Sequence, residues 1–217
     1  MTAFRLSLYE DSYSPGAWAE YMTGGSNRLL FCIQGSAGLG EIGSVLRQEA
    51  AVCPGLTYVT TGHDGAVVWR WELCRADDED EIEGAGVTSR LLGSGHLNLD
   101  EDRDYLFRCE SLGLPPGDSL PPHRLMGPSL TLCMQGEIET KSGDVSRQYS
   151  QFDAWFDAGR DLISIEAHDE QPSLMLRGML LSPVQAGERS SVGLADNGPD
   201  DGKSRFEKIH AEGVIAI

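Results

Sequence analysis

Hydrophobic residues alternate with polar or small residues over short spans of this chain. In the segment 129–135, Leu130, Leu132 and Met134 fall on one side of an extended backbone, and the residues between them are polar or small. Three further segments are short and rich in β-branched, aromatic or aliphatic residues, with turn-forming residues between them: 66–73, 162–168 and 173–181. This period of two predicts β-strands, and many short strands predict a sandwich or barrel.

The chain also repeats itself. LLFCIQG at 29–35 is matched 101 residues later by LTLCMQG at 130–136, and the same offset carries an expected Pro15-Gly16 turn onto Pro116-Gly117. After small insertions VVWRWEL aligns with LMLRGML, which makes Arg70 equivalent to Arg177. A repeat of roughly 70 residues is too long for a solenoid unit and predicts the duplication and fusion of a small domain.

One window favours a helix. The segment 41–52, EIGSVLRQEAAV, is the best helical candidate, and it has no clear counterpart in the second copy. We therefore expect little helix overall.

The repeat and the charge pattern divide the chain into four parts. We expect an N-terminal half at 1–75 and a C-terminal half at 100–182. Between them, 76–99 is interpreted as an acidic connector and linking strand, because its block of like charges cannot pack. The remaining 183–217 is interpreted as a polar tail whose last residues, GVIAI, are able to add a strand.

Composition excludes several classes of function. Among 217 residues, 34 are acidic and 17 are Lys or Arg, which gives a formal charge of −17. Such a chain repels nucleic acid and anionic membrane surfaces, so we expect neither as a partner. The five cysteines show no zinc-site spacing, and no segment has the length of a membrane span or a signal sequence. We expect a cytoplasmic protein.

The glycine spacing of the second copy matches a known motif. Gly117 and Gly136 flank His123, which stands six residues after Gly117. This arrangement resembles the first cupin motif, G(X)5HXH(X)3-4E(X)6G, in which two His and one Glu bind a metal. The resemblance implies an all-β fold of two tandem cupin barrels, also described as double-stranded β-helices or jelly rolls, with little helix.

The same resemblance shows where the metal ligands are missing. In the second copy the other His position holds Leu125, and the Glu position falls on Ser129 or Leu130. The His of the second cupin motif is replaced by Leu162. In the first copy the corresponding positions are occupied by Met22, Gly24, Arg28 or Leu29, and Tyr58. We therefore expect no metal and no cofactor.

The motif geometry implies a small mixed pocket in the second barrel. His123 is a candidate general base or polar anchor there. Arg177 is a candidate for holding an anion through two hydrogen bonds, with a structural ion pair as the alternative for both Arg177 and Arg70. The other candidate ligand-binding residues are Ser129, Cys133, Trp155, Leu162 and Tyr58, with core packing as the alternative for the aromatic residues. His63-Asp64 and His168-Asp169 also recur, at positions where we expect turns.

A competing motif lies in the first half. GLGEIG at 38–43 satisfies GxGxxG, the dinucleotide-binding fingerprint, with Asp64 as a possible ribose partner. It lies inside the repeat, however, and its counterpart GEIETKSGD lacks the glycines. No run of βα units follows, so we do not expect a parallel sheet.

Three functions remain open at this point. The first is a metal-free bicupin that binds a small polar or anionic organic molecule in its C-terminal barrel. The second is a metal-independent epimerase, isomerase or lyase that uses His123 as acid or base. The third is a scaffold or regulatory module without a small ligand. For all three we expect a homodimer formed through sheet edges.

Overall fold

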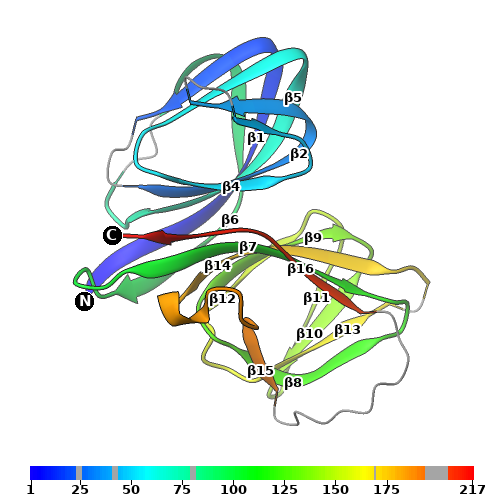
Figure 1. Ribbon diagram of the computed structural model, residues 1–217. Helices are drawn as coiled ribbons and strands as arrows, with labels where there is room; N and C mark the ends of the chain where they lie inside the picture. Colours follow the sequence, from blue (N-terminus) through cyan, green and yellow to red (C-terminus); the bar gives the residue numbers. More distant parts are fainter. Residues whose placement is uncertain (23–25, 41–43, 79–81, 169, 194–204) are drawn as a thin grey trace.

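The computed structural model describes residues 1–22, 26–40, 44–78, 82–168, 170–193 and 205–217. Within these residues nearly all regular structure is antiparallel β-strand, apart from one 3-10 turn, η1 (Pro183–Gln185). The strands form an upper and a lower barrel (Figure 1). The predicted all-β fold is confirmed. No helix in the described part of the chain has the length and hydropathy of a membrane span.

The first barrel is one curved sheet of long strands. Its order is β3-β2-β5-β1-β6, and β4 also pairs with β2. The strands are β1 (Thr2–Tyr21), β2 (Asn27–Leu39), β3 (Ser44–Leu46), β4 (Ala50–Pro54), β5 (Thr57–Arg75) and β6 (Ile82–Leu99). Residues 82–99, part of the expected connector, therefore form a strand that pairs with β1.

The second barrel is built from two five-stranded sheets, β12-β9-β14-β7-β16 and β11-β10-β13-β8-β15. We call them sheet B and sheet C. The strands of sheet B are β7 (Tyr105–Leu114), β9 (Ser129–Gln135), β12 (Ala154–Asp157), β14 (Ser173–Leu181) and β16 (Phe206–Ile215). The strands of sheet C are β8 (Ser119–Leu125), β10 (Ile138–Ser142), β11 (Val145–Tyr149), β13 (Ile163–Ala167) and β15 (Ser191–Gly193).

The pairing registers confirm the internal repeat. Arg70 on β5 pairs with Tyr9 on β1 and with Leu30 on β2. Arg177 on β14 pairs with Glu110 on β7 and with Thr131 on β9. Glu110 and Thr131 lie 101 residues after Tyr9 and Leu30. The two arginines therefore occupy the same place in two copies of one sheet unit.

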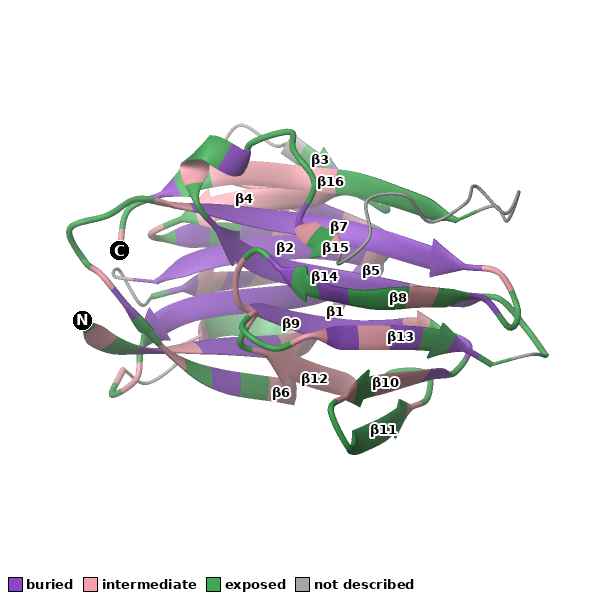
Figure 2. Cartoon of the chain, turned by 90° about the horizontal axis from the view of Figure 1, so that it is seen from below, coloured by how far each residue is buried: buried purple, intermediate pink, exposed green. Residues whose placement is uncertain are grey.

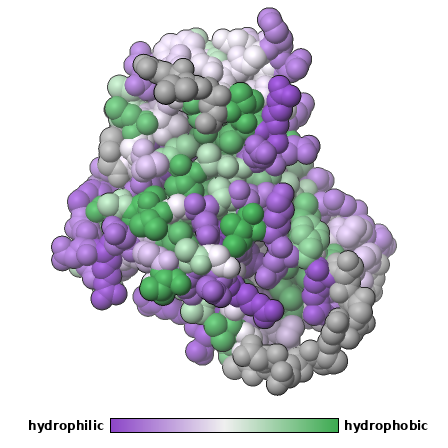
Figure 3. Space-filling view, viewed as in Figure 1, coloured by the Kyte–Doolittle hydropathy of each residue, from purple (hydrophilic) through white to green (hydrophobic). Residues whose placement is uncertain are grey.

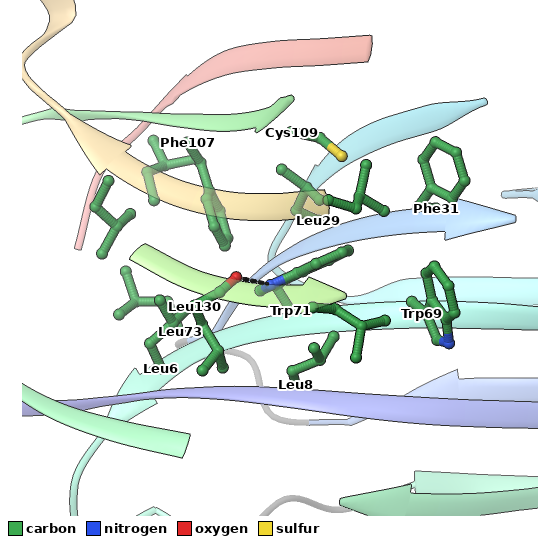
Figure 4. Close-up of a cluster of buried hydrophobic side chains, with 14 of the residues drawn as sticks. Leu6, Leu8, Leu29, Phe31, Trp69, Trp71, Leu73, Phe107, Cys109 and Leu130 are labelled. Atoms are coloured by element: carbon green, nitrogen blue, oxygen red, sulfur yellow. Dashed lines mark hydrogen bonds between the residues drawn. The ribbon is translucent and has the colours of Figure 1, made fainter. Parts of the chain in front are cut away.

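Side-chain alternation divides the core into three clusters. One fills the first barrel, around Leu30 and Val68, and one fills the second, around Met175 and Ile165. The third lies between the barrels and includes Trp71. Figure 4 shows this junction, where side chains from both halves meet. The central strands β5, β7 and β14, which meet there, are largely buried, whereas β11 and parts of β8 are exposed (Figure 2).

Three local predictions are wrong. Of the expected helix 41–52, residues 44–46 and 50–52 lie in strands that pair with β2, and 41–43 lie outside the described residues. Pairing with β2 satisfies the backbone there and overrides a weak helical pattern. His63-Asp64 lies within β5 rather than in a turn. Pro15-Gly16 is a bulge inside β1, where the register shifts and Gly16 has a φ of 71°.

The expected tail contributes to the second barrel. In the described parts of 183–217, β15 pairs with β8 of sheet C and β16 pairs with β7 of sheet B. The fully buried Arg108 holds this segment by donating hydrogen bonds to the carbonyl oxygens of Gln185 (2.5 Å) and Glu188 (2.7 Å). Its Nε also donates to Oε2 of Glu212 at 2.8 Å. We call residues 183–193 with β16 the strap.

Candidate functional site

The interior face of sheet B presents a row of polar groups. Trp155 on β12 pairs with Thr131 on β9, which pairs with Arg177 on β14, which pairs with Glu110 on β7. The adjacent row on the same face includes Asp157 opposite Ser129 and Ser129 opposite Met179. Because residues two apart on a strand share a face, both rows point into the barrel with Met175 and Met179 of its core.

Arg177 is buried with few partners. It is 3% exposed, and its only ion pair among the described residues joins Nε to Oε1 of Glu110 at 3.4 Å. This contact lacks hydrogen-bond geometry, and Nε has no other hydrogen-bond acceptor there. Glu110 is also bound by the strap, because the hydroxyl of Ser190 in the strap donates to its Oε1 at 2.6 Å. A guanidinium in this state retains most of its hydrogen-bonding capacity.

The equivalent arginine of the first barrel, Arg70, has acidic and aromatic partners around its guanidinium group. Nε of Arg70 donates to Oδ2 of Asp11 at 2.7 Å, and its Nη1 contacts Glu72. The guanidinium also lies over the ring of Tyr9, at 4.2 Å from the centroid, and over that of Tyr21, at 4.7 Å. Asp11 is fully buried, so Arg70 forms a closed structural network.

Substitutions between the copies explain the difference. Residues 112, 129 and 179 of the second barrel occupy the positions that Asp11, Arg28 and Glu72 hold in the first. They are Leu112, Ser129 and Met179. The charged partners have therefore been removed around Arg177, and Arg28, which pairs with Glu72 at 2.7 Å, has been replaced by a small hydroxyl. Oγ of Ser129 is buried and has no hydrogen-bond partner among the described residues.

His123 faces this row from sheet C. It lies on β8 opposite Ile163 of the barrel core, and it is 6% exposed. Its Nδ1 lies 3.0 Å from the carbonyl oxygen of Pro121, so Nδ1 carries the proton and donates. Burial lowers the pKa of His123, and the charge of Arg177 lowers it further. Within the described residues no carboxylate is hydrogen-bonded to the ring.

A cavity of about 380 Å³ opens beside these groups. It lies between β12, at the edge of sheet B, and the β10–β11 hairpin, at the edge of sheet C. Trp155 and Asp157 line it from one side, and Ile163 lines it from the other. The ring of Trp155 stacks on Tyr149, with centroids 4.3 Å apart. The cavity therefore lies at the Trp155 end of the row, and Thr131 and Arg177 are not among its lining residues.

The predicted site residues do not share one environment. His123, Ser129, Cys133 and Arg177 are buried within the second barrel, and Trp155 lines the cavity. Leu162 is half-buried and does not line the cavity.

Tyr58 requires a correction. Its side chain is 38% exposed and stacks on Trp18, whereas the neighbouring Val59 points into the first barrel. Strand alternation places Tyr58 on the outside, where it cannot contribute to an interior site.

Cys133 is a structural thiol. Its Sγ donates to the carbonyl oxygen of Gln135 at 3.4 Å, and burial raises its pKa to about 11. It is therefore a protonated thiol at neutral pH.

Sequence reasoning missed Glu110, Ser190 and Asp157. The offset of 101 residues does map Tyr9 onto Glu110, so the change from an aromatic ring to a carboxylate beside Arg177 is a readable signal. Nothing local marks Ser190, because it reaches Glu110 across 80 residues of chain.

Comparisons with known proteins identify the fold. No family model matches the sequence, and no curated protein matches it. Among solved structures, a mutant of Bacillus subtilis oxalate decarboxylase is similar, with a TM-score of 0.61, 12% identity, and coverage of 87% of this chain and 71% of that one. AerE from Microcystis aeruginosa has a TM-score of 0.57 and 15% identity, with coverage of 84% of this chain and 89% of that one. The 11S allergen from Cocos nucifera also has a TM-score of 0.57, with 12% identity and coverage of 85% of this chain and 84% of that one. The chain has the cupin fold.

The residues present do not fit the metal ion that the cupin motifs bind. At the positions where the motif resemblance places metal ligands, Leu125, Ser129 and Leu162 supply no imidazole or carboxylate, and only His123 does. Over the described ranges, no group of three or more His, Cys, Asp or Glu side chains is arranged to hold a metal.

Proposed function

We propose that this cupin-fold protein binds a small polar or anionic organic molecule inside its second barrel, without a bound metal ion, and that its first barrel is structural. One observation carries the proposal. Arg70 and Arg177 occupy equivalent positions, but Arg70 is enclosed by acidic and aromatic partners, whereas Arg177 has a single ion pair at 3.4 Å among the described residues. A buried cation without sufficient partners is costly unless a ligand completes its hydrogen bonds.

The surrounding groups support the same site. Ser129 and His123 add polar atoms on the interior face, and a cavity lies at the Trp155 end of the row that contains Arg177. Ligand sites typically combine apolar walls with a few such convergent polar groups, in cavities of about 300–1,000 Å³.

A binding screen tests this function. The full chain, purified without chelator, is analysed for metals and screened by thermal shift against sugars, organic acids and amino acid derivatives. We expect a hit whose effect disappears in Arg177→Gln and persists in Arg124→Gln, a change of an exposed arginine on the same strand as His123. Stoichiometric iron, manganese, nickel or zinc bound within a barrel contradicts the proposal, as does a hit that does not depend on Arg177.

A second candidate function is metal-independent acid–base catalysis by His123. Its favouring observation is the ring state: Nδ1 is fixed by Pro121, and the lowered pKa keeps Nε2 unprotonated at neutral pH, as a general base requires. Against it, no described carboxylate is hydrogen-bonded to the ring. If a ligand is found, His123→Ala distinguishes the two functions: turnover lost with binding retained supports catalysis, and an absence of any turnover by the unchanged protein excludes it for that ligand.

A further inference from the structure

The open edge of Arg177 favours a carboxylate. Glu110 faces Nε, which has no hydrogen-bond partner, and neither Nη atom forms an ion pair or hydrogen bond with another described residue. The planar Nη edge binds a carboxylate through two parallel hydrogen bonds. Glu110 does not fill this role, because the Ser190 hydroxyl holds it at 2.6 Å and Arg108 lies 3.9 Å from its other oxygen.

Ser129 supplies a further donor on the same face. It stands opposite Met179, and Met179 lies two residues beyond Arg177 on β14. Its Oγ is buried, is partnerless within the described residues, and replaces the first barrel's Arg28. A buried hydroxyl without a partner is destabilising, so a ligand oxygen that accepts its proton is stabilised there.

His123 requires a different group from the same ligand. With Nδ1 donating to Pro121, Nε2 of the neutral ring is an acceptor, and no described residue donates to it. An acceptor repels a carboxylate oxygen and binds an O–H or N–H. A hydroxyl fits better than an ammonium group, which would place a second cation beside Arg177. Packed sheets lie about 10 Å apart, so one small molecule is able to contact both.

We infer that the ligand is a small hydroxy carboxylate, whose acid group binds Arg177 and Ser129 and whose hydroxyl donates to Nε2 of His123. The inference rests on the proposed function and specifies its ligand. The wall formed by Trp155 and Tyr149 at the cavity suits a flat or apolar substituent on this molecule.

Calorimetric titration with matched probes tests the inference. Mandelate carries all three features, phenylacetate lacks the hydroxyl, mandelamide lacks the charge, and phenylglycine replaces the hydroxyl with an ammonium group. Lactate, propionate and lactamide repeat the comparison without the ring. We expect one enantiomer of a hydroxy acid to bind. Each probe that lacks its hydroxyl or its carboxylate should bind with an affinity at least roughly tenfold lower, as the loss of a buried charged or polar hydrogen bond predicts.

Variants assign each feature to a residue. Arg177→Gln is expected to lower the affinity for the hydroxy acid at least about tenfold and to leave the affinity for the amide unchanged. His123→Phe is expected to lower the affinity for the hydroxy acid to that of its deoxy analogue. The affinity for the deoxy analogue itself should not change. Arg124→Gln is the matched control and should change neither. Because the probe comparisons use the unchanged protein, they remain decisive if a variant does not fold.

The outcomes separate the two proposals. If sugars or other neutral molecules bind in an Arg177-dependent manner and the acids do not, the carboxylate inference is overturned and the proposed function stands. Equal affinity of mandelate and phenylacetate overturns the role of His123. If neither these probes nor the wider library bind, both proposals fail.

Discussion

The indole ring of Trp71 in the first barrel lies directly on the backbone of Gly178 in the second. A Cβ atom built on Gly178 would stand 2.5 Å from Cδ1 of Trp71, and Nε1 of Trp71 donates to the carbonyl oxygen of Leu130 at 2.8 Å (Figure 4). The two residues follow Arg70 and Arg177, so they are equivalent in the repeat. The duplicated sheets therefore pack by placing the largest side chain of one copy on the smallest of the other.

Replacing Gly178 should weaken the junction between the barrels. Gly178→Ala forces the indole to move in a fully buried site, and such overpacking costs about 1–3 kcal/mol in the free energy of unfolding. Urea denaturation measures the loss. Gly62→Ala is the control, because the nearest atom to a Cβ there, Oγ of Ser36, is 4.0 Å away. Equal losses in the two variants would show that the contact is unimportant.

The two equivalent arginines should differ in their contribution to stability. Arg70→Met leaves Asp11 and Glu72 buried without their shared cation, and we expect a loss of about 3–5 kcal/mol. Arg177→Met should cost less than half as much, because Glu110 keeps Ser190 and Arg108. Chemical denaturation of both variants gives the comparison. A larger loss for Arg177→Met would mean that Arg177 is mainly structural.

His123 should make the protein less stable in mild acid. Its pKa lies below the usual 6.5, mainly because of burial and additionally because of the charge of Arg177, while its hydrogen bond to Pro121 partly offsets the shift. The unfolded chain therefore takes up this proton at a higher pH than the folded chain. The free energy of unfolding falls as the pH decreases from about 6.5 to the folded pKa.

His123→Gln should flatten the stability profile in that window. The remaining slope includes His210, whose pKa is also lowered, first by burial and then by the charge of Lys208. Urea titrations between pH 7.5 and 5.5 provide the measurement, with His210→Gln as the second variant. A slope that is unchanged in His123→Gln means that the ring is not protonated differently in the folded and unfolded chains.

Arg108 should be required to hold the strap. Arg108→Met removes the donors to Gln185, Glu188 and Glu212 from a fully buried position, and a loss of about 3–5 kcal/mol is expected. Hydrogen exchange should rise first in 185–193 and 206–215. Arg103→Met is the control, since its ion pair with Asp100 is exposed and contributes at most about 1 kcal/mol. Unchanged exchange in the strap would disprove the role of Arg108.

One face of the molecule carries its hydrophobic residues in a dispersed pattern. On the face shown in Figure 3, hydrophobic residues form several separate clusters among hydrophilic ones. A charge of −17 distributed over such a surface favours solubility.

Much of the architecture could be predicted because it depends on local periodicity. Alternation determines which side chains share a face of a strand, and the repeat places Arg70 and Arg177 at the same point of two sheets. The loss of acidic partners around Arg177 is also visible as Leu112 and Met179. The helix expected at 41–52 was predicted wrongly at 44–46 and 50–52, because short apolar runs fit either a helix or an edge strand and pairing with β2 decides between them.

The sequence by itself determined most of the strands and the duplication, since these depend on residue types and their spacing. Only the tertiary structure decided how many hydrogen-bond partners the guanidinium group of Arg177 has. Its neighbour Glu110 is held by Ser190, 80 residues away in a strap that returns over the barrel. A contact of that kind depends on the path of the whole chain, which no local pattern records.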